Sequence, residues 1–177
     1  MSNCSSVLSG CSNESVFIRV LGKGSFQNSA PVKDLIRQML QRGFNKFIID
    51  LSSCEQMDST FMGTLAGAAL RLKENGNGRL AIIHANTRNR HLLQGLGLDQ
   101  VIEVHDGSGG YQFPSQPEAL TPVEINPETD QRKVVLEAHE NLVSTNPSNA
   151  TKFSDVFEFL RQNPNSNQNN PSQPEEK

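Results

Sequence analysis

The chain has 177 residues, a net charge of −3 and a hydrophobic content of 35%, which allows one ordinary domain with extensions. No stretch reaches the ~20 apolar residues of a membrane span, and the first residues lack the basic and apolar regions of an export signal. Three cysteines without a CxxC pair suit a reducing compartment, so we expect a cytoplasmic protein. Between residues 16 and 106 there are 11 Lys and Arg against 8 Asp and Glu, a density too low for a nucleic-acid-binding surface.

Apolar runs and helical periodicity alternate along the first hundred residues. The apolar runs predict a short strand at 7–8 and further strands at 16–22, 47–51, 79–84 and 101–104. Helical spacing predicts helices at 31–43, 60–75 and 87–96, with a loop at 52–57. The alternation predicts an α/β fold with a mostly parallel four- to five-stranded sheet covered by helices, over residues 15–106 after an N-terminal segment at 1–14.

Composition changes after residue 106. The segment 107–124 is rich in Gly, Ser, Pro and Gln and is predicted to be a linker. Residues 125–162 predict a C-terminal helical hairpin, whose two helices begin with Asn126-Pro127 and Asn146-Pro147, with Asn as the cap and Pro as the first helical residue. Phe153, Val156, Phe157 and Leu160 share one face, which we expect to pack on the sheet domain or make a second contact. The tail 163–177 is too polar to order itself.

Two candidate motifs have simpler explanations. The run from Val20 to Phe26 (VLGKGSF) is similar to a kinase phosphate loop, but the other kinase motifs are missing, so we expect a strand-to-helix turn. The four histidines lack metal-ligand spacing, although His84 and His105 both end predicted strands and can share one sheet edge. We therefore expect no metal and no cofactor.

Asp58 to Gly63 (DSTFMG) is the informative segment, at the start of a predicted helix. In one interpretation, Asp58 or Ser59 caps the helix, which contributes ~1 kcal/mol. In the other, a hydroxyl group lies at a helix N-terminus beyond a parallel strand, where the helix dipole stabilises an added phosphate. Spacing alone does not decide between the two interpretations.

The run from Phe47 to Leu51, then Met57-Asp58-Ser59-Thr60 and Gly63, resembles the STAS domain of bacterial anti-anti-sigma factors (anti-sigma factor antagonists). Their hallmark is Asp-Ser-Ser/Thr-Gly-Leu-Gly at the start of the second helix. The likeness covers about residues 16–106. Two departures are evident: Phe61 and Met62 replace the motif's Gly and Leu, so that an aromatic group stands beside the acceptor, and the turn at Lys23 lacks the family's Asp.

The resemblance implies a non-enzymatic switch. Ser59, with Thr60 as second choice, would be phosphorylated by an anti-sigma factor that has serine-kinase activity, and a phosphatase would remove the phosphate. The unmodified protein would bind and sequester the anti-sigma factor and so release a sigma factor. The resemblance places this contact on two segments, Asp58, Ser59, Thr60, Phe61, Met62 and Gly63, and Lys23, Gly24, Ser25 and Phe26.

Two alternatives use the same residues differently. The first is a STAS-type scaffold or lipid-transport accessory subunit without a phospho-switch, in which Ser59 and Thr60 only pack. The second is an enzyme with Ser59 as nucleophile, supported by Asp58 and His84. The enzyme is disfavoured because the Gly-x-Ser-x-Gly motif is missing and adjacent Asp58 and Ser59 cannot form a base relay.

Overall fold

The computed structural model describes residues 5–12, 14–114 and 120–164, and within them it has the α/β architecture that the sequence predicts. Its sheet has six strands in the order β5-β4-β3-β2-β1-β6. The strands are β1 Ser6–Ser12, β2 Ser15–Gly24, β3 Lys46–Met57, β4 Arg79–Ile83, β5 Glu103–Val104 and β6 Thr121–Pro122. Strands β2 to β5 run parallel, whereas β1 is antiparallel to both β2 and β6, so the sheet is mixed. The short strand predicted at 7–8 is confirmed as part of β1.

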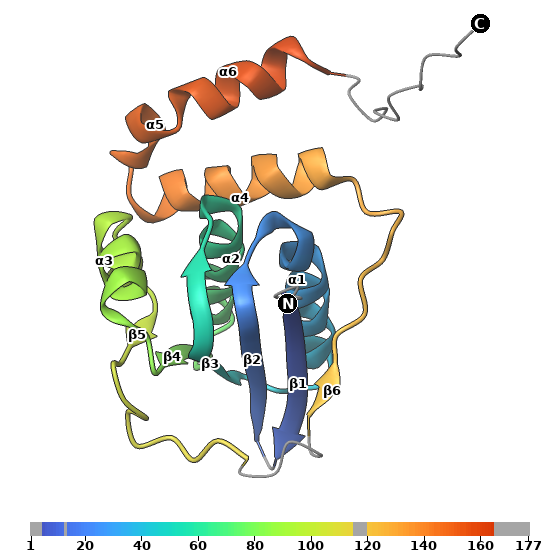
Figure 1. Cartoon of the computed structure of the whole chain (residues 1–177), viewed down its shortest axis with the longest axis vertical. Coiled ribbons are helices and arrows are strands. Elements are labelled where there is room, and N and C mark those ends of the chain that lie inside the picture. The colour runs from blue at the N-terminus through green and yellow to red at the C-terminus, as the bar shows by residue number, and fades with distance from the viewer. Residues whose placement is uncertain (1–4, 13, 115–119, 165–177) are drawn as a thin grey trace, which may run out of the picture.

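Three helices cover one face of this sheet (Figure 1). They are α1 Phe26–Gln41, α2 Ser59–Glu74 and α3 Thr87–Gly95, the last followed by the short 3-10 helix η1 Leu98–Gln100. Alternate residues of the strands point toward them, and Ile18, Ile49 and Ile82 are fully buried with Leu65 of α2. The main apolar core therefore lies between the parallel strands and these helices.

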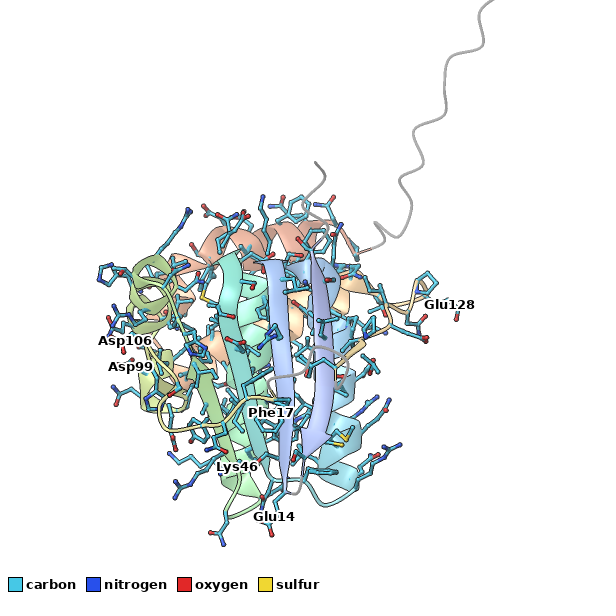
Figure 2. All side chains as sticks on the ribbon, turned by 60° about the horizontal axis from the view of Figure 1, so that its bottom comes forward. Glu14, Phe17, Lys46, Asp99, Asp106 and Glu128 are labelled. Atoms are coloured by element: carbon cyan, nitrogen blue, oxygen red, sulfur yellow. The ribbon has the colours of Figure 1, made fainter. Side chains whose placement is uncertain are left out.

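The opposite face of the sheet has a smaller core. Phe17, Ile48 and Ile83 are buried there with Leu120, and Phe113 packs edge-on against Phe17 at 5.1 Å between ring centroids. Figure 2 shows Phe17 on this face, crossed by the chain that follows β5. The segment 107–124 thus differs from the predicted linker, because its aromatic and aliphatic residues cover the sheet and its end forms β6.

The remaining helices are α4 Gln131–Thr145, α5 Asn149–Lys152 and α6 Ser154–Gln162. Helix α4 crosses α1 and α2 near the start of α2, and α5 and α6 return over α4 (Figure 1). Val134, Ala138 and Leu142 of α4 are buried, as is Leu160 of α6. The expected packing of the hairpin on the sheet domain is confirmed, with α4 as the helix that makes the contact. The tail predicted from residue 163 lies almost wholly outside the described residues.

Both Asn-Pro cap predictions are wrong. Helix α4 begins four residues later than Pro127, because the carboxylate of Asp130 accepts hydrogen bonds from the N–H groups of Arg132 and Lys133. Asn126 instead accepts from the N–H of Glu128 in a local turn. Asn146 likewise accepts from the N–H and hydroxyl of Ser148, and α5 starts only at Asn149. Asn side chains satisfy such turns as readily as helix ends.

The predicted loop at 52–57 is also wrong, since β3 continues through it. Cys54 and Met57 are buried, and Leu21 to Gly24 of β2 pair with this stretch across two irregularities in register. Helix α1 begins at Phe26, five residues before the predicted start. These two extensions bring the end of β2 and the start of α2 together at the carboxyl end of the parallel strands.

Candidate functional site

Asp58 joins the two segments that the sequence singled out. It is the N-cap of α2, and its Oδ1 accepts a hydrogen bond from the Phe61 N–H at 2.8 Å. Its Oδ2 accepts from the N–H of Phe26 at 2.8 Å, and its own N–H donates to the Gly24 carbonyl at 2.8 Å. One carboxylate therefore caps α2 and fixes the turn before α1.

The turn from Lys23 to Phe26 is further held by Asn28, which is buried. The Asn28 side-chain Oδ1 accepts from the Ser25 N–H at 2.8 Å, and the Asn28 side-chain Nδ2 donates to the Lys23 carbonyl at 2.9 Å. The Lys23 and Phe26 side chains remain exposed. The turn is thus a rigid backbone feature that presents one cationic and one aromatic side chain to solvent.

Phe61 lies beneath this turn and away from solvent. It is 0% exposed, and a Cβ added to Gly24 would come within 2.6 Å of its ring. The aromatic residue that departs from the family motif is therefore part of the core. Thr60, Met62 and Gly63 are buried as well, so within the predicted contact segment 58–63 only Asp58 and Ser59 are partly accessible.

Ser59 is the first residue of α2 and is half-buried. The first N–H groups of a helix have no intrahelical acceptor, and the Asp58 cap uses that of Phe61. The N–H groups of Ser59 and Thr60 consequently lie at the positive end of the helix dipole beside the Ser59 hydroxyl. This end of α2 suits an added anionic group, as the second interpretation of the motif requires.

His139 of α4 is the residue at this site that the sequence reasoning missed. Its Nε2 lies 3.0 Å from the Ser59 Oγ, and its Nδ1 lies 2.7 Å from the Val135 carbonyl oxygen. Because a carbonyl can only accept, Nδ1 carries the proton, and in the neutral ring Nε2 accepts from the Ser59 hydroxyl. Its position among the apolar residues Val135, Ala138 and Leu142 was the available signal, but 80 residues separate it from Ser59.

A family model described as "Mlab, STAS domain" matches residues 10–103 of the chain. The chain belongs to the STAS-domain family. The matched residues run from β1 to the start of β5, so the chain adds α4 to α6 beyond the matched part. The resemblance drawn from the DSTFMG segment is confirmed at the level of the family.

Two solved structures show that this STAS fold is shared with anti-sigma factor antagonists. One is a candidate antagonist from Thermotoga maritima, with 21% identity and a TM-score of 0.51, covering 55% of this chain and 84% of that one. Another comes from Mycobacterium paratuberculosis, with 16% identity and a TM-score of 0.50, covering 67% of this chain and 93% of that one. A comparison with curated proteins finds no match.

The other histidines of the STAS domain lie apart from Ser59. His84 Nδ1 is 2.9 Å from Oδ1 of the buried Asp50, whose Oδ2 accepts from Arg19 Nε at 2.7 Å. Burial acts to raise the pKa of Asp50, but the bonds from Ser52, His84 and Arg19 outweigh it and hold that pKa below its ordinary value. His84 therefore contacts Asp50. It does not form, with Asp58, the pair that the enzyme alternative would need to activate Ser59 as a nucleophile. His105 directly follows β5, and its carbonyl accepts from the N–H of Ala85, the residue after His84.

Two further observations bear on what the STAS domain can bind. Within residues 5–12, 14–114 and 120–164, no three or more His, Cys, Asp or Glu side chains gather as a metal site would require. Across the same residues, no helix combines the length and hydropathy needed to cross a bilayer.

Proposed function

We propose that this STAS protein is an anti-sigma factor antagonist, a binding module whose contact with an anti-sigma factor is switched by phosphorylation of Ser59. The observation that supports it best is the position of Ser59 directly after the Asp58 cap, as the first residue of a 16-residue helix. Its hydroxyl stands at the positive end of α2, at the edge where the turn at Lys23 also lies.

The switch works through charge. A phosphate adds roughly −1.5 to −2 charges beside Asp58. The helix dipole tolerates this charge in the free domain, whereas a partner surface packed against the start of α2 does not. A loss of about 3–4 kcal/mol in the complex lowers affinity several hundredfold, which is enough for a switch.

The proposed partner is an anti-sigma factor with serine-kinase activity, and a phosphatase resets the switch. The contact surface is the Asp58–Gly63 segment together with the turn from Lys23 to Phe26. The unmodified antagonist would sequester the anti-sigma factor and release its sigma factor, which places the function in the cytoplasm, where transcription occurs. No catalytic step by this chain is part of the proposal.

The experiment is to incubate the full chain with ATP and a kinase-type anti-sigma factor encoded beside it, and to map phosphate by mass spectrometry. We expect label on Ser59, none in Ser59→Ala, and undiminished label in the control Ser53→Ala, which removes an exposed serine of β3. Undiminished label in Ser59→Ala would move the acceptor to Thr60. Partner binding should fall at least a hundredfold on phosphorylation.

A second candidate is a STAS-type scaffold or lipid-transport accessory subunit without a phospho-switch. The cover that α4 forms over the start of α2 favours it, because this cover leaves Ser59 only partly accessible. Absence of phosphate on Ser59 under every kinase tested, with full binding of some other partner by Ser59→Ala, would select this candidate.

A further inference from the structure

Helix α4 occupies the face of α2 that the proposed partner would contact. A Cβ placed on Gly63 would lie 2.1 Å from the Ala138 carbonyl oxygen, so the two helix backbones touch at this point. One turn along α4, the Asn141 amide donates to the Gly63 carbonyl at 3.2 Å. His139 meets Ser59 from the same helix. A partner cannot reach this face while α4 is seated on it.

The contact of α4 with α1 and α2 is partly polar and contains few large buried side chains. Its buried residues are Val134, Ala138, His139 and Leu142, which include only one large aliphatic side chain. Glu137 pairs with Lys33 and, at 3.6 Å, with Arg71, and such half-exposed ion pairs contribute little to stability. A cavity of about 30 Å³ remains between α1, α2 and α4. Contacts with such a polar share open more readily than a continuous apolar core.

The contact at Ser59 is specific for an unmodified hydroxyl. Because the Val135 carbonyl requires a proton on Nδ1, a His139 ring with a single proton presents Nε2 to Ser59 as an acceptor, to which a hydroxyl can donate. A phosphate dianion has no proton to donate and is larger than the hydrogen it replaces. The ring cannot retreat freely, since Phe153 lies behind it at 4.8 Å between centroids and His139 is only 2% exposed.

We propose that α4 is a displaceable intrachain cover of the partner-binding face of α2, and that a seated α4 and a phosphorylated Ser59 exclude one another. This inference rests on Ser59 being the phosphorylation site proposed above. Phosphoryl transfer from ATP forms the Oγ–P bond, breaks the bond to the ADP oxygen and frees the hydroxyl proton, and the donor must approach Ser59 in line. The cover must therefore lift before Ser59 is modified or the partner binds.

The first test needs no kinase. Phosphoserine is incorporated at position 59 of the full chain during translation, and hydrogen exchange of residues 131–145 is measured. We expect exchange of these residues about tenfold faster than in the unmodified chain, which corresponds to a decrease of about 1.4 kcal/mol in the free energy of opening of α4. Exchange of β3 should not change. Phosphoserine at exposed Ser108 is the control and should change nothing. Equal or slower exchange with phosphoserine at 59 would overturn the proposal, the slower case meaning that a protonated His139 holds the phosphate.

The second test lifts α4 without phosphate. Gly63→Ala meets the backbone of Ala138 and Ala138→Arg meets the same contact from the other helix. Their controls are Gly95→Ala, where a Cβ meets nothing within 4 Å, and Glu140→Arg on the exposed side of α4. We expect the first pair to speed both exchange of α4 and phosphorylation of Ser59 about tenfold, and the controls to match the parent.

The outcomes separate the two proposals. Faster exchange of α4 without faster phosphorylation would overturn the cover. A chain that is never labelled on Ser59, even with α4 released, would overturn the phospho-switch, and the phosphoserine experiment would still decide whether α4 and a phosphate exclude one another.

Discussion

At the scale of single residues, Gly24 and Phe61 contact each other. This contact explains how the chain accommodates Phe61 where the family motif has glycine. The Phe61 ring occupies the space that a side chain at position 24 would need. An aromatic residue at 61 therefore requires glycine at 24, in the turn that Asp58 holds. The pair links the two segments of the candidate site through the core rather than through its surface.

We predict that Gly24→Ala lowers the free energy of unfolding by about 1–3 kcal/mol, because the new methyl group overpacks against Phe61. Urea denaturation of the full chain measures this change. Gly95→Ala, where a Cβ meets nothing within 4 Å, is the control and should be neutral or slightly stabilising. In a Phe61→Leu background the cost of Gly24→Ala should shrink, and an undiminished cost would show that the ring is not the obstacle.

Asp50 gives a prediction for acid conditions. Its pKa is held below the ordinary 3.8, so its ionised form stabilises the fold fully above that value, and this contribution is lost as the pH falls through the lowered pKa. We expect Asp50→Asn to cost about 1–3 kcal/mol at pH 7, because Arg19 and His84 lose a charged acceptor. The difference from the parent should narrow below pH 3.8 in urea titrations. A constant difference across this range would show that ionisation of Asp50 does not stabilise the fold.

At the scale of elements, periodicity predicted every strand of the parallel part and all three covering helices. In these elements, periodicity missed two stretches that are rich in polar residues. They are the end of β3 (SSCEQM) and the first turn of α1 (FQNSA). Their structure depends on partners elsewhere, the irregular pairing with β2 for the first and the Asn28 and Asp58 bonds for the second. Local sequence does not contain those partners.

The candidate site was predictable only in part for the same reason. A cap at Asp58 or Ser59 follows from a local pattern, and the structure has Asp58 as the cap and Ser59 as the first helical residue, one position before the predicted start. Among the small residues of α2, Ala66 and Ala69 lie in the main core, whereas Gly63 and Gly67 face α4. Neither glycine nor His139 carries a sequence signal that pairs it with the other helix. Contact between segments 80 residues apart is decided by the fold as a whole.

At the scale of the molecule, the sheet is covered twice and by different means. The covering helices and the sheet share a large apolar core, while the second face depends on Tyr111, Phe113 and Leu120 from the chain after β5. Helix α4 lies outside both layers and reaches the main core through Leu142. We therefore expect the stability of the fold to depend most on the helical core, less on the segment that covers the second face, and least on α4.

This order predicts the behaviour of two truncated chains. A fragment ending at Glu124 keeps β6 and both faces of the sheet, so we expect it to fold and remain monodisperse, with a loss of about 3 kcal/mol from the apolar contacts of α4. A fragment ending at Asp106 also loses the cover of Phe17, Ile48 and Ile83, and should be less stable and prone to aggregate. Urea denaturation followed by circular dichroism, with size-exclusion chromatography, measures both. If the longer fragment fails to fold while the full chain is stable, α4 completes the core and is no displaceable cover; if the two fragments are equally stable, the segment after β5 adds nothing to the second face.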